Sequence, residues 1–583
     1  MTVWLDGLAA LREHGWAATY ILLIILWGGM VMRGMLERSF KHAISDDEYF
    51  SLSAAGWIVP AFFLLLFLFG SSFLFGEIVG GILSTVLAIA SLFIVRFKRI
   101  SSPSVLLALV LFAFIILRFA FLKDTFLPSY FDSAEHYRLI QYVLDSYEQR
   151  AISTGLTGTL YHLGYHALNA ALSHFFRLSV VEVMLVFGQL VLALLPVSLF
   201  FIVRHETDST AAALFTSLLA GVGFHMPAHL LNWGKYPALL SLVCAHFVLG
   251  LAYILYRKGT GRSVLVLLGV GMTVSAFIHL RTLVVYGLVL VAWLITTLWK
   301  RWPVLYRYIG FGSVLILLAV DIYIARASPT LKLLLEGYIQ KDGWMLILMA
   351  LLTLASSVFF TELTFPLLGI LALLGLALFA PITLPVHGTL TLLDRPYVQM
   401  LLYLPLSLLG GLGLAGLLKW IQRLLPNWSL PGRFVVFSAF GLVLLNAVLH
   451  HDFYASVCCR FVSHDDFAAI TWMDNALPDD SKVLIASTNL YVTSLESPQA
   501  QTGVDAGIWI EPLISRTTAF AWQGLTFTAP NIHTELCKGK LDYIYVGGMP
   551  QSFDPLQLEE FPKWYQPAFE LPSARVYKVI GCK

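Results

Sequence analysis

The stretch that decides the fold is "SVLLALVLFAFIILRFAFLKDTFLPSYFDSAEHYRLI", Ser104 to Ile140. It opens with an apolar run at about 104–122, which is long enough to cross a bilayer as a helix. Directly after this run come Asp132, Glu135 and His136. Charged groups at a membrane are costly and usually mark a functional site. The pattern therefore predicts a membrane span followed by a polar site at the membrane surface.

The composition predicts a multi-pass membrane protein. The chain has 583 residues, of which 58% are hydrophobic and 12% charged, and its mean hydropathy is +0.78. Soluble domains carry about twice that charged fraction. The net charge of +2 and the lack of a basic-aromatic pattern argue against nucleic-acid binding. The run from Trp16 to Met32 predicts a full-length span rather than a cleaved signal.

The positions of Lys and Arg predict which side each loop faces, because cytoplasmic loops are enriched in both. The first span is followed by Arg33, Arg38 and Lys41, which predict an inner loop. A second inner loop is predicted by Arg96, Lys98 and Arg99. Because the span at 104–122 follows that loop, the Asp132 segment is expected outside. Both termini are expected on the outer side. The protein is expected in the plasma membrane. About fourteen spans are expected, at 16–32, 53–75, 77–95, 104–122, 180–203, 209–223, 236–256, 263–279, 282–299, 308–325, 344–360, 364–380, 398–418 and 432–449.

From about His451 the composition becomes mixed. A helix is expected over 465–477, and short strands over 481–487, 541–548 and 574–581. The predicted fold class is therefore an all-α polytopic transmembrane bundle with a small extracytoplasmic C-terminal α/β domain. The expected divisions are N-terminal transmembrane helices, a catalytic transmembrane module with outer loops, and the outer domain, at 1–103, 104–450 and 451–583.

Four of the five cysteines fall in the predicted outer domain, where an oxidising compartment permits disulfides. Cys458 and Cys459 are adjacent, and adjacent cysteines rarely bond each other. We expect each of them to reach one of Cys537 and Cys582, or all four to remain free thiols.

The conspicuous polar residues gather in the predicted outer loops, which suggests an outward-facing site. We take Asp132, Glu135 and His136 as candidate catalytic residues, with Asp132 and Glu135 also as candidate metal ligands. The candidate substrate-binding residues are His162, His166, His225, His229, Asn232, Lys235, His279, Arg281, Asp394, Arg395 and Gln399.

Residue type suggests the chemistry. On a helix, Asp132 and His136 share one face, and a carboxylate there can act as general base on a hydroxyl. Arg281, Arg395 and Lys235 suit a phosphate leaving group.

Plainer roles stay open for the same residues. Asp132 could cap a helix, the histidine pairs could pack at the interface or hold a metal, and the two arginines could be interfacial anchors. The sequence contains no HExxH motif.

Three segments resemble the GT-C superfamily of membrane glycosyltransferases. These are "LPSYFDSAEHYRLI" after a span, then "YHLGYHALNAALSHFFRLSVVEVMLVFGQLVLALLPVSLFF", and the late "LLDRPYVQMLLYLPLSLLGGLGL". The resemblance covers most of 104–583, and it departs from the family in its first three spans and in its D-x-x-E-H motif. It implies that a sugar moves from a polyprenyl-phosphate donor to a hydroxyl of a glycan, lipid or protein, with inversion and with Asp132 as general base. It implies no certain cofactor, with Mg²⁺ or Mn²⁺ as an open candidate.

Three other functions remain open. The main alternative is a transporter or flippase of a lipid-linked or anionic substrate, although such proteins place polar groups near mid-membrane, often with inverted repeats. The others are a polysaccharide polymerase or ligase and a scaffold without catalysis.

Overall fold

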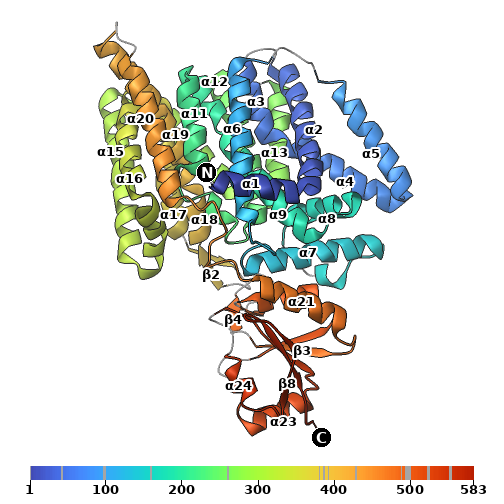
Figure 1. The fold of residues 1–583 in the computed structure, drawn as a ribbon. Coiled ribbons are helices and arrows are strands. Elements are labelled where there is room, and N and C mark those ends of the chain that lie inside the picture. Colours follow the sequence, from blue (N-terminus) through green and yellow to red (C-terminus); the bar gives the residue numbers. More distant parts are fainter. Residues whose placement is uncertain are drawn as a thin grey trace.

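The structure, a computed structural model, is a large helical bundle with a small mixed domain below it (Figure 1). It describes residues 2–582 except 41–43, 96–99, 158–160, 259–260, 380, 385–387, 392, 427–429, 487–488, 493–499, 504, 522–524 and 550–553. The predicted inner-loop residues Lys41, Arg96, Lys98 and Arg99 therefore lie outside the described residues.

The bundle is built mainly from long apolar helices. Its first half contains α1 (Thr2–Glu13), α2 (Gly15–Phe40), α3 (Asp46–Gly56), α4 (Ile58–Phe75), α5 (Glu77–Leu92), α6 (Ser102–Phe119), η1 (Ala120–Leu122), α7 (Phe131–Glu148), η2 (Thr154–Leu156), α8 (Gly164–Phe176), α9 (Val180–Ser198) and α10 (Phe200–Thr207). Its second half contains α11 (Thr210–Leu218), η3 (Leu219–Gly223), η4 (Ala228–Leu230), α12 (Tyr236–Lys258), α13 (Arg262–Ile278), α14 (Thr282–Arg301), α15 (Val304–Ala327), α16 (Pro329–Phe359), α17 (Thr361–Phe379), the hairpin β1 (Pro381–Leu384) and β2 (Gly388–Thr391), α18 (Arg395–Leu401), α19 (Tyr403–Leu424) and α20 (Leu430–His450).

The predicted membrane bundle is confirmed. Among the described residues, 12 helical segments are long and apolar enough to cross a membrane, and α5 and α13 are shorter apolar helices at two further predicted spans. α9 is buried along its membrane-length window, whereas α15 is almost wholly exposed, as expected for a helix that faces lipid. The segment left between the predicted spans 308–325 and 344–360 is not a loop, since Pro329 begins the 31-residue helix α16.

The C-terminal domain is a sheet between two helical layers. It contains α21 (His464–Ala476), β3 (Lys482–Ile485), β4 (Asn489–Val492), β5 (Ala500–Gly503), η5 (Ala506–Trp509), α22 (Ile510–Leu513), β6 (Thr517–Phe520), α23 (Pro530–Lys538), β7 (Tyr543–Val546), α24 (Leu556–Glu559), β8 (Tyr565–Glu570) and β9 (Arg575–Val579). The five-stranded sheet has the order β6-β3-β7-β9-β8, with β6, β3 and β7 parallel and β9 and β8 antiparallel. The three predicted strands are thus β3, β7 and β9, and the predicted helix is α21.

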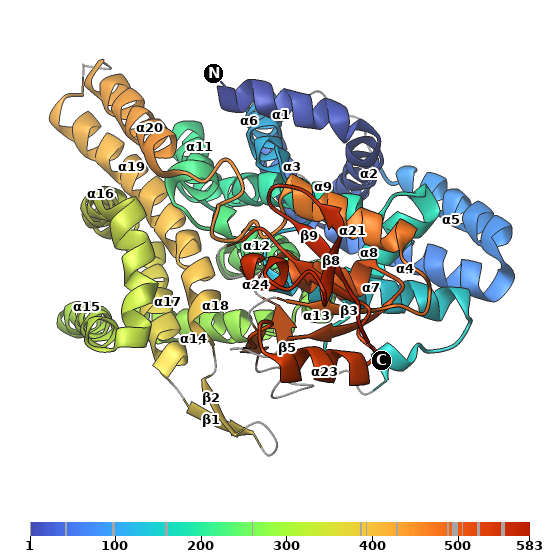
Figure 2. The same cartoon turned by 60° about the horizontal axis from the view of Figure 1, so that its bottom comes forward.

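Alternate residues along β3 serve the two faces of the sheet, as the two-residue period of a strand requires. Val483 and Ile485 pack with α21 and η5, whereas Leu484 packs with α23 and α24. The first of these cores also includes Leu127 and Ala134, which come from the segment around α7. The domain is therefore joined to the bundle through α7 (Figures 1 and 2).

The cysteine pairing expected from the sequence is wrong. Cys537 on α23 bonds Cys582 near the C-terminus, with Cα atoms 5.3 Å apart, and Cys458 bonds its neighbour Cys459. Because α23 packs against the strand that ends just before Cys582, these two partners already satisfy each other, and neither is left for the Cys458–Cys459 segment.

Candidate functional site

Asp132 lies in the first turn of α7 and forms an ion pair with Lys235, which precedes α12. Their side chains are 20% and 35% exposed, respectively. The approach of the two segments depends on Gly234, whose φ is +63°. A Cβ there would lie only 2.5 Å from Ser133 Oγ. A residue with a side chain at position 234 would therefore push Lys235 away from α7.

Four predicted histidines gather beside this pair. His136 Nδ1 lies 3.2 Å from His166 Nε2. The ring centroids of His162 and His279 are 4.5 Å apart. The His279 ring also stacks on that of Tyr397 of α18, with centroids 5.3 Å apart. Residues from α7, α8, the α13–α14 turn and α18 thus meet in one polar cluster, which we call the Asp132 cluster.

Burial keeps these histidines uncharged. It lowers the pKa of His162 to about 4 and that of His166 to about 3. Burial also holds the pKa of His136 well below its usual value, with a further contribution from His166 and then Lys235. At neutral pH these imidazoles serve as hydrogen-bonding groups, and positive charge must come from Lys or Arg.

The two predicted arginines stand at the edge of the Asp132 cluster. Arg281 pairs with Asp394, and both side chains are exposed. Asp394 also caps α18, because its Oδ1 accepts a hydrogen bond of 2.9 Å from the Tyr397 N–H. Burial raises the pKa of Tyr130; the Asp132 charge raises it further, and Arg395 opposes both. Arg395 is therefore close enough to act on the same region as Asp132.

The remaining predicted residues form a second group, which we call the Asp452 cluster. His225 Nδ1 donates to Asp342 Oδ2 over 2.6 Å, and Gln399 Nε2 lies 3.5 Å from His225 Nε2. His229 Nδ1 lies 2.9 Å from Asp452 Oδ2 and 3.2 Å from Asn232 Nδ2. The structure thus separates His225, His229, Asn232 and Gln399 from the contacts that Asp132 makes.

Sequence reasoning missed four members of the Asp452 cluster, which are Asp452 itself, Lys341, Arg118 and Asp342. Lys341 donates to Asp452 Oδ2 over 2.8 Å, Arg118 Nη1 donates to the Asp452 carbonyl over 3.2 Å, and Asp342 holds His225. Extending α16 back through "GYIQKD" would have revealed the face that carries Lys341 and Asp342. Arg118, by contrast, was hidden inside an otherwise apolar span.

The Glu135 side chain pairs outside the Asp132 cluster. It accepts from Arg138 Nη1 over 3.1 Å, and Arg138 Nη2 in turn donates to Glu511 of α22 over 2.6 Å. Glu135 therefore belongs to the contact between α7 and the C-terminal domain.

The donor set around Asp132 does not fit a metal ion. Asp132 is paired with Lys235 and Glu135 with Arg138, and no third ligand atom joins them in the described part of the chain. In that part, His533, Cys537 and Cys582 are the one group of three with converging ligand atoms. Its two cysteines share a disulfide, which leaves no thiolate to bind a metal.

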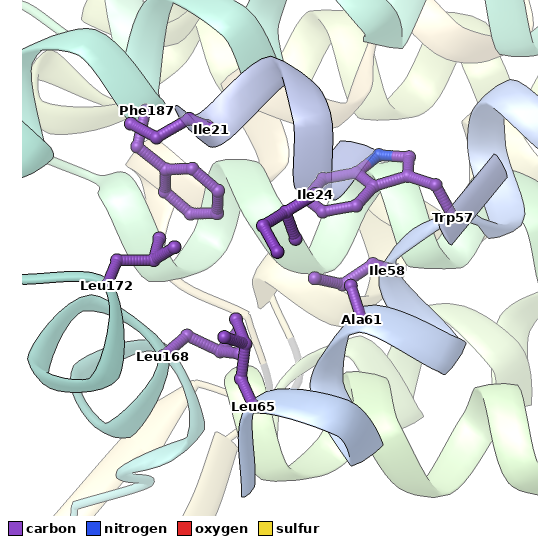
Figure 3. A pocket seen from close by; sticks show the side chains of 9 residues that line it. All are labelled: Ile21, Ile24, Trp57, Ile58, Ala61, Leu65, Leu168, Leu172 and Phe187. Atoms are coloured by element: carbon purple, nitrogen blue, oxygen red, sulfur yellow. The ribbon is translucent and has the colours of Figure 1, made fainter. Parts of the chain in front are cut away.

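Two cavities lie away from both clusters. One, of about 10 Å³, is lined by nine apolar side chains, including Trp57 and Phe187 (Figure 3). A space of that size holds about one water, and its lining of mostly aliphatic and aromatic carbon is too small and too apolar for a substrate. The other, of about 640 Å³, lies over Leu430 to Phe437 on α20. Neither includes a residue of the Asp132 or Asp452 cluster.

Comparison with known proteins gives a family. A family model described as "Family of unknown function (DUF6541)" matches residues 50–489. No curated protein matches the sequence. Among solved structures, the chain is similar to the arabinofuranosyltransferase AftD from Mycobacteria, with 14% identity and a TM-score of 0.44. The similarity covers 82% of this chain and 42% of that one, so the chain spans less than half the length of AftD. Because the family model matches well over half of the residues, the chain belongs to the DUF6541 family of unknown function.

Proposed function

We propose that this chain is a membrane glycosyltransferase that moves a sugar from a polyprenyl-phosphate donor to a hydroxyl acceptor, with Asp132 as general base. The observation that carries the proposal is the Asp132–Lys235 pair. It is a partly exposed carboxylate and cation at the end of a membrane bundle, beside uncharged histidines and on the helix that contacts the small C-terminal domain. The many-helix bundle also agrees with the architecture that the GT-C resemblance implies.

The proposed reaction is a single displacement. Lys235 holds one oxygen of Asp132, and Oδ1 makes no hydrogen bond to another described residue. Oδ1 accepts the proton of the acceptor hydroxyl as that oxygen attacks the anomeric carbon. The bond between this carbon and the phosphate oxygen breaks, and its electron pair leaves with the lipid phosphate. Attack from the face opposite the phosphate inverts the anomeric centre.

Positive charge near the reacting carbon would stabilise the departing phosphate. Lys235 is in place, and Arg281 and Arg395 stand at the edge of the same cluster. The uncharged His136, His162 and His166 would orient hydroxyl groups of the sugar or the acceptor. No step requires a metal ion.

The proposed arrangement places the site and the C-terminal domain on the outer face of the plasma membrane. α6 runs toward α7, so its first turn lies at the opposite end of the bundle. There Asp46 accepts from Ser104 over 2.5 Å and pairs with Arg33. Basic residues at that end suit the cytoplasmic side. In this arrangement, residues 104–450 supply the catalytic module and 451–583 help to hold the acceptor.

The test is the Asp132→Asn variant, assayed in membranes with polyprenyl-phosphate sugars. We expect transfer to fall about 100-fold or more, the contribution typical of a positioned general base. Asp145→Asn is the matched control, because Asp145 lies on the same helix and is partly exposed. Full activity of Asp132→Asn would remove Asp132 as the base.

The second candidate function is a transporter or flippase of a lipid-linked or anionic substrate. The buried Arg118 and Asp342 favour it, because they lie within the structure's candidate spans Ser102–Leu122 and Glu336–Phe359 and such residues often line a substrate path. Movement of labelled lipid-linked sugar across vesicles that contain the protein, without turnover, would select this function over transfer.

A further inference from the structure

Arg118 is a buried cation in a membrane span, and it lacks a carboxylate partner. It is 4% exposed and lies one turn before the end of the span Ser102–Leu122. Its hydrogen bonds go to neutral oxygens, from Nε and Nη2 to Gln189 Oε1 over 3.3 and 3.2 Å, and from Nη1 to the Asp452 carbonyl. Among the described residues it forms no ion pair. A guanidinium in such a place is costly without a counter-anion.

The nearest carboxylate is already engaged. Burial opposes ionisation of Asp452, but hydrogen bonds from His229 and Lys341 outweigh it and hold its pKa below the usual value. Asp452 is therefore ionised and neutralises Lys341 at 2.8 Å. Arg118 therefore contacts the carbonyl of Asp452 and not its carboxylate, whose charge acts on the guanidinium only from a distance.

Unused hydrogen-bond donors surround Arg118. A guanidinium offers five N–H groups, and three of these have acceptors in the described chain. Gln189 Nε2 is buried without a hydrogen-bond partner among the described residues, and the buried His451 ring lies within the field of Arg118 and close to the Phe224 backbone. Burial, followed by the charge of Arg118, lowers the pKa of His451 to about 3, so its neutral ring still supplies one N–H. Buried donors in this number normally have acceptors.

We propose that Arg118, Gln189, His451 and Lys341 form a binding site for a phosphate group. A phosphate supplies both the missing negative charge and several acceptor oxygens, and arginine matches its geometry. Lys341 is 36% exposed and Asp452 21%, so the site opens on their side. The phosphate belongs either to a lipid that reaches the membrane end of the bundle or to free inorganic phosphate.

This site is separate from the chemistry proposed for Asp132. His229 and Asn232 belong to the Asp452 cluster, and Lys235 of the same connecting segment belongs to the Asp132 cluster. A phosphate bound at Arg118 would therefore contact a different set of side chains from those that contact Asp132.

The experiment measures binding to the purified full-length protein in detergent. The three probes are a polyprenyl monophosphate, the matching polyprenol, and inorganic phosphate. We expect a phosphate probe to bind and to raise the melting temperature, and the polyprenol to do neither. Arg118→Gln should weaken that binding about tenfold or more, the loss expected for a hydrogen bond to a charged group. The exposed Arg262→Gln is the control and should bind like the wild type.

The outcomes separate the ligand sources. Arg118-dependent binding of the lipid phosphate alone identifies a lipid headgroup, and Arg118-dependent binding of inorganic phosphate identifies a free anion. If Arg118→Gln does not fold, Lys341→Gln decides, since its side chain is partly exposed and the variant should still bind several-fold more weakly. The site is overturned if neither phosphate probe binds, or if the variants bind both phosphate probes as tightly as the wild type does.

Asp132→Asn distinguishes this inference from the proposed function. That variant should keep Arg118-dependent phosphate binding while it loses transfer. If it kept transfer as well, the proposed role of Asp132 as general base would fail and the phosphate site would stand.

Discussion

At the scale of single residues, the Asp132–Lys235 pair matters for chemistry more than for stability. Partly exposed ion pairs contribute about 0–1 kcal/mol, because water screens them and two flexible side chains are ordered. What the pair does provide is a carboxylate fixed on α7 and an ammonium fixed beside it. Gly234 supports this arrangement through the close approach to Ser133.

The buried histidines make stability depend on pH. An unfolded histidine binds a proton near pH 6.5, whereas His162 and His166 bind one only near pH 4 and pH 3. Between these values the unfolded state holds more protons, so the free energy of unfolding falls as the pH is lowered from about 6.5 and levels off below the folded-state values.

We therefore expect the melting temperature to drop between pH 7 and pH 4, and to drop less in His166→Gln, which removes one such group. Thermal unfolding across this pH range checks the prediction. The exposed His464→Gln is the control and should follow the wild type. An identical pH slope in His166→Gln and the wild type would contradict it.

At the scale of elements, the first turn of α3 ties three other helices together. Asp46 pairs with Arg33 of α2 and accepts from Ser104 of α6. Asp47 accepts from Arg204 of α10 over 2.7 Å. Because Asp47 is only 3% exposed, removing its charge leaves the arginine without its buried partner.

Asp47→Asn should lower the free energy of unfolding by about 3 kcal/mol, the cost of breaking a buried ion pair. Asp208→Asn is a close control, because Asp208 pairs with the same Arg204 but is 94% exposed. Thermal or denaturant unfolding of the two variants should separate them clearly. An equal loss of unfolding free energy in both variants would show that burial does not determine how much these ion pairs stabilise the fold.

α16 shows why local pattern alone misplaced an element. The predicted spans 308–325 and 344–360 leave a loop between them, but the helix α16 runs through most of that segment, so that Tyr338, Lys341 and Asp342 contact the Asp452 cluster. Their polar groups have partners between η3 and η4, on α18 and in the segment after α20, which are far apart in sequence. Tertiary pairing thus lets a helix continue through residues that would otherwise favour a loop.

At the scale of the whole molecule, α7 is held from two sides. On the bundle side, His136 contacts His166. On the side of the C-terminal domain, the Tyr130 N–H donates to the Cys459 carbonyl over 2.9 Å, and the ring centroids of Tyr137 and Trp509 are 5.7 Å apart. The C-terminal domain is therefore part of what positions Asp132.

Trp509→Ala should loosen this docking, because Trp509 is fully buried and truncating a buried aromatic costs about 3–5 kcal/mol. We expect faster proteolytic release of the C-terminal domain and weaker transfer. Trp420→Ala is the control, since Trp420 is 53% exposed on α19. Wild-type protease resistance in Trp509→Ala would contradict the role of this contact.

The sequence by itself determined the membrane bundle, the mixed C-terminal domain and the polar character of the segment after α6. Hydropathy and residue period are local properties, so each span and strand can be predicted from its own residues. Only the tertiary structure decided which polar residues meet. It divided the candidates between the Asp132 and Asp452 clusters, turned Glu135 toward Arg138 and joined Cys537 to Cys582. These contacts bridge segments far apart in the chain, and burial, which only the fold creates, keeps the histidines uncharged and leaves Arg118 without a carboxylate partner among the described residues.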